Sequence, residues 1–149
     1  MLEWYKETVK DTAMMGPTRF ASVIQKAKKI ALEHPDPKMY NILLILTDGD
    51  IHDLKETIAE IAAISAENVP LSIIIVGLGD DEFINMVRLD GDDIAVKAGA
   101  RDLVQFVKFN EVVKRAPAGQ AMAMLAGMLL EEVPDQFVQH YTEKGVFPS

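Results

Sequence analysis

The chain has 149 residues, of which 49% are hydrophobic and 26% are charged, as expected for one ordinary globular domain. The formal net charge of -8 argues against nucleic acid as a partner, because binding to phosphates needs a surface rich in Lys and Arg. Cysteine is absent, which excludes disulfides, thiolate metal sites and cysteine nucleophiles. Because a chain without disulfides is compatible with a reducing compartment, we expect a cytoplasmic protein.

The first half of the chain is predicted to form a helix, a strand, a helix and a strand. Apolar residues recur at helical spacing over Arg19–Glu33, and the prolines that follow end this helix. The runs Asn41–Thr47 and Leu71–Val76 are short and rich in branched aliphatic residues, which is typical of strands that helices cover on both faces. A second helical stripe, Asp53–Glu67, lies between them. This strand-helix-strand unit predicts two central strands that run parallel to each other.

Three further elements are predicted downstream. Asp81–Leu89 fits a short helix, and Leu103–Phe109 alternates like a strand at a sheet edge. Ala118–Val133 carries apolar residues on one face, which predicts a helix that Pro134 ends. The order of these elements predicts an α/β fold, with a mainly parallel sheet and helices on both faces.

An acidic pair, Asp48 and Asp50, follows directly after the first predicted strand. In open α/β sheets, ligands collect at the carboxyl ends of the strands, so a carboxylate here lies over the binding crevice. The alternative is that the Asp-Gly step at Asp48 only forms a turn. A second loop, Gly77–Asp81, follows the next strand, where we expect a tight turn and a carboxylate that caps the following helix.

The other side chains that often carry chemistry show no useful pattern. The serines lack the flanking glycines of a nucleophile elbow, so a catalytic triad has no support. The histidines have no zinc-ligand spacing and are expected at the surface: His34, His52 and His140. We therefore expect a binding protein and not an enzyme.

Several separated segments occur in the order and spacing of a known domain family. They are Gly16–Phe20 (GPTRF), Tyr40–Asp53 (YNILLILTDGDIHD), Pro70–Gly79 (PLSIIIVGLG), Phe83–Asp93 (FINMVRLDGDD), Asp102–Phe109 (DLVQFVKF) and Glu132–Phe137 (EVPDQF). Together they resemble the A-domain of the copine family, a domain of the von Willebrand factor A class. The resemblance implies that residues 1–149 form a single, N-terminally incomplete A-domain with a partial Rossmann-like fold.

The resemblance also implies a divalent-metal adhesion site for Mg²⁺ or Mn²⁺, built from three loops. Thr18 matches the family's threonine ligand and Asp48 matches its third-loop aspartate, while Asp50 is a candidate partner of the ligands. The family's first loop, Asp-x-Ser-x-Ser, is absent from this sequence. Because Mg²⁺ prefers about six oxygen ligands, we expect metal binding by this chain alone to be weak or absent.

By the same resemblance, the chain is expected to be a protein-interaction module of a calcium-dependent phospholipid-binding protein. Protein partners would bind at the face that carries the metal site, and upstream C2 domains would associate the parent protein with membranes. Some related proteins carry a RING finger instead. The family's first strand, which would pair with Asn41–Thr47, lies upstream of Met1, so we expect self-association through that edge or another packing that hides it.

Two other interpretations stay open at the level of sequence. Asp48-Gly49-Asp50 after a buried strand resembles the nucleophile motif of haloacid-dehalogenase-type, Mg²⁺-dependent phosphatases, although too few residues separate it from the later acidic loop. Alternatively, the chain is a purely structural fragment without metal binding, in which Thr18 and Asp48 are only cap and turn residues.

Overall fold

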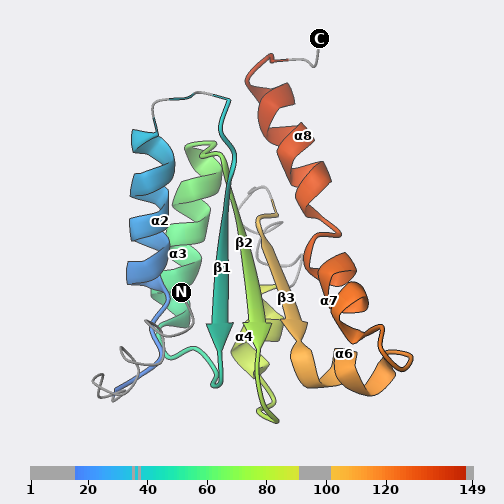
Figure 1. Ribbon diagram of the computed structural model, residues 1–149. Coiled ribbons are helices and arrows are strands. Elements are labelled where there is room, and N and C mark those ends of the chain that lie inside the picture. The colour runs from blue at the N-terminus through green and yellow to red at the C-terminus, as the bar shows by residue number, and fades with distance from the viewer. Residues whose placement is uncertain (1–15, 35, 37, 91–101, 147–149) are drawn as a thin grey trace, which may run out of the picture.

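The computed structural model describes residues 16–34, 36, 38–90 and 102–146. Helices and strands alternate along the first two thirds of this range, and three helices in succession form its end (Figure 1). In chain order the elements are α2 (Ala21–Glu33), β1 (Asn41–Thr47), α3 (Leu54–Ala66), β2 (Leu71–Gly77), α4 (Ile84–Leu89), β3 (Val104–Lys108), α6 (Phe109–Arg115), α7 (Ala121–Leu129) and α8 (Val133–Glu143). None of these helices is both long and apolar enough to cross a membrane.

The three strands form a parallel sheet in the order β1-β2-β3. Leu44 lies opposite Ile74, and Ile75 lies opposite Phe106. Helices α2, α3 and α4 pack against one face of the sheet, and α6, α7 and α8 lie over the other (Figure 1). This arrangement confirms the predicted α/β fold with helices on both faces of a parallel sheet.

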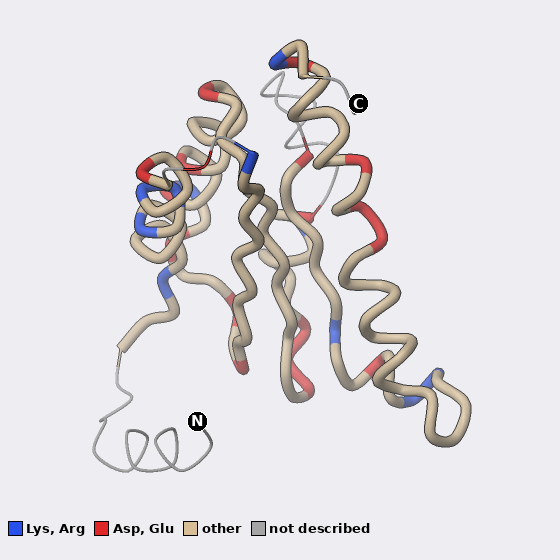
Figure 2. Tube along the Cα trace, turned by 45° about the horizontal axis from the view of Figure 1, so that its top comes forward, with Lys and Arg blue, Asp and Glu red and all other residues tan. Residues whose placement is uncertain are grey.

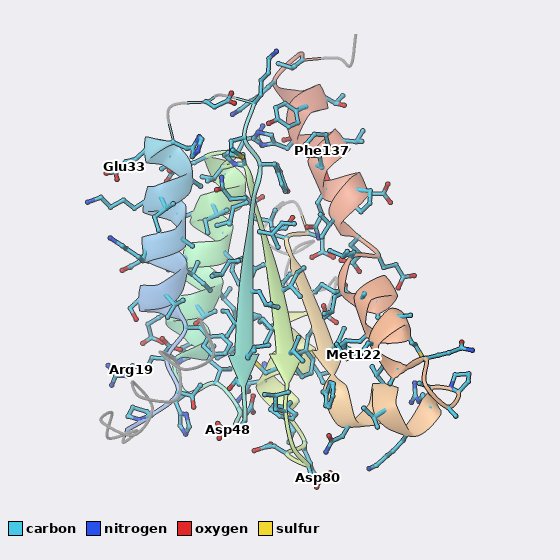
Figure 3. All side chains as sticks on the ribbon, viewed as in Figure 1. Arg19, Glu33, Asp48, Asp80, Met122 and Phe137 are labelled. Carbon is cyan, nitrogen blue, oxygen red and sulfur yellow. The ribbon has the colours of Figure 1, made fainter. Side chains whose placement is uncertain are left out.

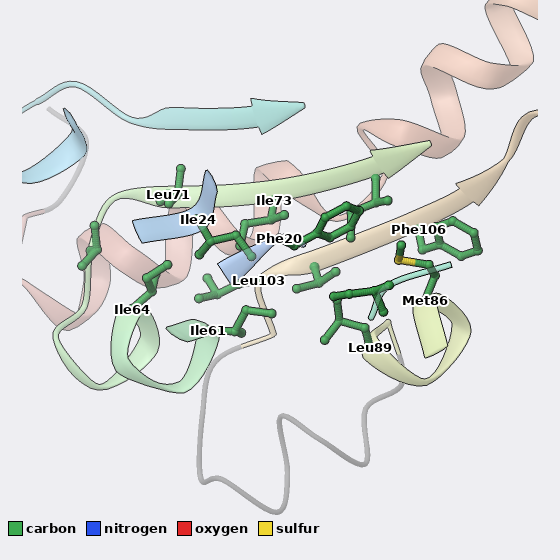
Figure 4. Close-up of a cluster of buried hydrophobic side chains, with 14 of the residues drawn as sticks. Phe20, Ile24, Ile61, Ile64, Leu71, Ile73, Met86, Leu89, Leu103 and Phe106 are labelled. Atoms are coloured by element: carbon green, nitrogen blue, oxygen red, sulfur yellow. The ribbon is translucent and has the colours of Figure 1, made fainter. Parts of the chain in front are cut away.

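The main hydrophobic core lies between the sheet and the layer of α2, α3 and α4 (Figure 4). Ile24 and Ile64 contribute from the helices and are fully buried, as are Ile73 and Ile75 on β2. Phe83 is also fully buried, although it has a left-handed backbone with φ of 51°. A smaller cluster fills the opposite face, where α6 and α7 meet β3. Strand β1 contributes to the main cluster only through the half-buried Leu43 and Ile45.

The two central strands of the sequence prediction differ in their surroundings. Every residue of β2 is buried, as predicted for a central strand. In β1, by contrast, half-buried and exposed residues alternate up to the buried Thr47, and the strand forms one edge of the sheet in the described part of the chain. For the described residues this edge position agrees with the open edge expected from the family resemblance and not with the central position expected from the aliphatic run, which does not reveal what lies beside the strand. The edge position predicted for β3 is confirmed for the part of the chain that the structure describes.

The C-terminal helices also correct the prediction. The expected single helix over Ala118–Val133 is shorter, since α7 ends at Leu129 and a separate helix, α8, begins at Val133. Pro134 lies in the first turn of α8 and does not end a helix there. Proline fits the first turn well because its missing N–H would have no partner within the helix. Helix α6 was not predicted.

Helix α8 is attached to the amino end of the sheet through buried polar groups. Ser72 Oγ lies 2.5 Å from Gln136 Oε1 and 2.9 Å from the hydroxyl of Tyr40. His140 is fully buried and its Nδ1 lies 2.7 Å from Asn68 Oδ1, so the prediction that it lies at the surface was wrong. Buried polar groups need such partners, which no local pattern in the sequence reveals because the paired residues lie far apart along the chain.

Candidate functional site

The loops after β1 and β2 lie together at the carboxyl end of the sheet. The backbone N–H of Leu78 donates to the Thr47 carbonyl over 2.7 Å, which joins the two loops. Thr47 Oγ1 donates to the Gly49 carbonyl over 2.8 Å and shapes the turn that carries Asp48. The side chain of Asp48 is exposed at the tip of the β1 loop, and Asp80 lies at the tip of the β2 loop (Figure 3). This is the sheet edge that the sequence predicted as the binding crevice.

Thr18 lies in the loop before α2 and is held against the β1 loop by His52. The His52 N–H donates to the Thr18 carbonyl over 2.9 Å, and the Thr18 N–H donates to His52 Nδ1 over 3.1 Å. The Thr18 hydroxyl lies 3.9 Å from the position that a Cβ on Gly49 would occupy. The structure therefore brings Thr18 next to the turn that carries Asp48, although the two residues are 30 positions apart in the sequence.

Asp53 makes a second connection between the same two loops. One carboxylate oxygen accepts the N–H of Phe20 over 2.9 Å and the hydroxyl of Thr57 over 3.2 Å. The other oxygen accepts the N–H of Ala21 over 3.1 Å. Asp53 precedes α3 in the chain, yet it caps the N-terminus of α2, whose first N–H groups have no partner within the helix. The sequence predicted only that a helix begins at Asp53, and it held no sign that this side chain caps another helix.

Asp50 has its carboxylate turned toward the first turn of α4. Its Oδ2 accepts the N–H of Asn85 over 3.0 Å, and its Oδ1 accepts those of Ile51 and Met86 over 3.0 and 3.2 Å. These bonds occupy both oxygens with backbone donors. The predicted role of Asp50 beside the metal ligands stays a prediction, whereas its role as the cap of α4 is visible in the structure.

Asp48 and the Thr18 hydroxyl differ from these capping carboxylates. Neither group makes a hydrogen bond to another residue in the described ranges. In the next loop, Asp80 accepts a hydrogen bond from Asn110 over 3.0 Å, and Asp81 accepts the N–H of Phe83 over 3.0 Å just before α4. Asp48 is therefore the carboxylate of the β1 loop that is available to an external cation or donor.

The described residues do not make a complete metal centre. Nowhere in the described ranges do three His, Cys, Asp or Glu side chains converge as a metal site would require. Oxygen donors such as Thr18 and Asp48 are the type that Mg²⁺ prefers, but the ion takes about six of them. The acidic residues are also distributed along the sheet edge rather than clustered (Figure 2). Two donors from adjacent loops form a partial site at most.

The whole chain is similar to proteins of one known family. A family model described as Copine matches residues 1–149. Copine-C from Dictyostelium discoideum is 41% identical over 156 aligned residues, an alignment that covers 100% of this chain. The chain spans 28% of the length of that relative.

Proposed function

Because the chain belongs to the copine family, we propose that it is a protein-interaction module of a copine-like, calcium-dependent phospholipid-binding protein. Its recognition face is the carboxyl edge of the sheet, where the Thr18 loop meets the loop that carries Asp48. In this proposal the chain binds a partner and does not catalyse a reaction. Phospholipid binding and peripheral membrane association belong to the longer protein, through C2 domains outside these residues.

The proposal rests on one observation, which is that the aspartates of the β1 loop have different roles. Asp50 and Asp53 each use both carboxylate oxygens to cap helices. Asp48 lies between β1 and these residues, is exposed, and makes no hydrogen bond to another described residue. A loop held rigid by two capping carboxylates, with a third carboxylate left in solvent, is well suited to present that group to a ligand.

The proposed ion at Asp48 and Thr18 is Mg²⁺ or Mn²⁺, which these two residues would hold through their side-chain oxygens. Further ligands must come from outside the described residues, since Mg²⁺ takes about six oxygens and keeps its waters tightly. A carboxylate of a protein partner is one such ligand. We therefore expect the chain by itself to bind the ion weakly.

Paramagnetic Mn²⁺ provides a test with residue-level resolution. Added to the ¹⁵N-labelled chain, Mn²⁺ should broaden the amide signals of Thr18 and Gly49 first, and excess Mg²⁺ should reverse the effect. Asp48→Asn should abolish this selective broadening. Asp80→Asn is the matched control, because it removes another exposed carboxylate, from the neighbouring loop, and should leave the broadening unchanged. Equal broadening in Asp48→Asn would contradict the proposed site and favour a purely structural fragment.

A phosphatase of the haloacid-dehalogenase type is the competing enzymatic function. Its paired aspartates would both have to reach a substrate, whereas here the carboxylate of Asp50 is bound to the backbone of α4. The test is hydrolysis of p-nitrophenyl phosphate with Mg²⁺ by the purified chain. Turnover that Asp48→Asn abolishes would overturn the proposal of a binding module.

A further inference from the structure

A cavity of about 270 Å³ lies across the edge of the sheet that β3 forms. Helix α4 contributes Val87 to its lining from one face of the sheet, and α6 and α7 contribute Val112, Met124 and Met128 from the other (Figure 1). The upstream strand of the family is expected beside β1, at the opposite end of the strand order, so it does not cover this cavity.

The backbone at this edge of β3 is already bound by side chains. The Phe106 N–H donates to Asp90 Oδ1 over 2.8 Å, and the Val104 N–H donates to Asp102 Oδ1 over 3.3 Å. These carboxylates take the place of the carbonyl groups that an added strand would supply, and charged side chains commonly protect sheet edges in this way. An occupant of the cavity therefore enters with a side chain and not as a further strand.

The size and lining of the cavity suit one large apolar side chain. Small-molecule sites usually measure about 300–1,000 Å³, so this cavity falls just below their range. Phe106 and Val112 in its lining are buried, Val87 is 50% exposed, and Met124 and Met128 are half-buried. Covering these exposed apolar atoms is favourable by about 25 cal/mol per Å².

The two methionines favour an aromatic side chain as the occupant. Met124 and Met128 are four residues apart on α7, so they lie on the same face of the helix, and both line the cavity. The thioether is polarizable and flexible, and a sulfur beside an aromatic ring contributes about 0.3–1.5 kcal/mol. An aromatic side chain also buries about 150–250 Å² by itself. We therefore expect an aromatic anchor rather than an aliphatic one.

The rim of the cavity is basic on the side of α6. Glu111 lies 3.7 Å from Lys108 Nζ and 3.4 Å from an Arg115 guanidinium nitrogen, so two cations share one carboxylate. Lys114 is exposed beside Arg115 and adds a third cation. The carboxylate of Asp90, which also lines the cavity, is turned to the backbone of β3. In a chain of net charge -8, this local excess of cations complements carboxylates on a partner.

We propose that this groove binds an acidic segment of a protein partner, with one aromatic side chain in the cavity and flanking carboxylates beside Lys114 and Arg115. The groove lies at β3, whereas Thr18 and Asp48 lie beside β1 at the other end of the strand order. It therefore goes beyond the proposed function by adding a second contact surface that needs no metal ion.

Titration of the ¹⁵N-labelled full chain with short peptides tests the chemistry of the occupant. The probe acetyl-Glu-Glu-Phe-Glu-Glu-amide should shift the amide signals of Val87, Val112 and Met124 together. Alanine in place of the phenylalanine should raise the Kd by about tenfold or more. Lysine in place of the four glutamates should raise it several-fold at low salt, and about 1 M NaCl should shrink that difference because the pairing charges are exposed.

Substitutions in the chain test the place of binding. Val87→Lys puts an ammonium group at the mouth of the cavity and should raise the Kd of the acidic phenylalanine peptide by about tenfold, since a buried aromatic anchor is lost. Met122→Lys is the matched control, because Met122 is 69% exposed on α7 and does not line the cavity. Arg115→Glu should remove the preference for the acidic peptide over the basic one. Circular dichroism should show that all three variants stay folded.

Three results would overturn the proposal. The first is an absence of shifts at these amides up to millimolar peptide. The second is equal binding by Val87→Lys and Met122→Lys, and the third is equal binding of the acidic and basic peptides at low salt. If the same signals shift with protein concentration alone, the occupant is a second copy and not an acidic partner.

The metal dependence separates this inference from the proposed function. Binding of the acidic peptide should be the same in Mg²⁺ and in EDTA, whereas the Mn²⁺ broadening at Thr18 and Gly49 requires Asp48. Failure of the peptide titration leaves the Mn²⁺ experiment unaffected, so the two failures are distinguishable.

Discussion

Asp53→Ala is the substitution that best tests how the candidate site is built. Its carboxylate accepts the N–H groups of Phe20 and Ala21 at the start of α2, and the hydroxyl of Thr57. Loss of a capping carboxylate costs about 0.5–2 kcal/mol, and loss of its charge near a helix N-terminus adds about 0.3–1 kcal/mol. We expect Asp53→Ala to lower the free energy of unfolding by about 2 kcal/mol, or the Tm by roughly 4–8 °C.

Urea denaturation followed by circular dichroism measures this change, with Glu56→Ala as the control. Glu56 lies in the first turn of α3 and makes no hydrogen bond to another described residue, so its removal should cost about 0.5 kcal/mol or less. Asp53→Asn keeps one acceptor oxygen and should fall between the two. The amide signal of Thr18 should also shift in Asp53→Ala, since the cap fixes its loop. If Asp53→Ala and Glu56→Ala differ by less than about 0.5 kcal/mol, the capping role is refuted.

Three further outcomes follow from the packing. Gly77→Ala places a Cβ 2.9 Å from the ring of Phe83, so it should destabilise the fold by about 1–3 kcal/mol in urea denaturation. Burial raises the pKa of Tyr141 above 10.0, so its stabilising effect is present below about pH 10 and is lost as pH rises through the folded-state value. Tyr141→Phe should therefore remove from an ultraviolet phenol titration a step that lies above the ordinary tyrosine pKa. Gln136→Ala leaves the buried hydroxyl of Ser72 without one of its partners and should cost about 1–3 kcal/mol, and a melting temperature equal to wild type would contradict this.

The elements that the sequence predicted well are those with a strong local pattern. The aliphatic run at Leu71–Val76 became the buried strand β2, and the stripe in Asp53–Glu67 became α3 with almost the predicted bounds. Boundaries and breaks were less predictable. Pro134 was expected to end a helix and instead lies in the first turn of α8, because the same residue suits both positions and only the surrounding chain decides.

The candidate site was predictable to the level of its residue types and its place on the sheet. An acidic turn after a buried strand located Asp48, and the family resemblance added Thr18. The contributions of His52 and Asp53 were not predictable, because each acts on a residue more than 30 positions away. Such contacts depend on how two loops meet in space, which no local pattern encodes.

The sequence alone determined the parallel strands, the helical layers and the acidic edge, since alternation and spacing of apolar residues reflect local geometry. Tertiary structure decided which face of each element is covered and which carboxylate is free. Asp48, Asp50 and Asp53 have the same side chain within six residues, yet two cap helices and one faces solvent. Likewise Asn41–Thr47 and Leu71–Val76 have similar composition, yet the second strand is buried and the first lies at an edge of the sheet within the described residues, because burial depends on the neighbours that packing supplies.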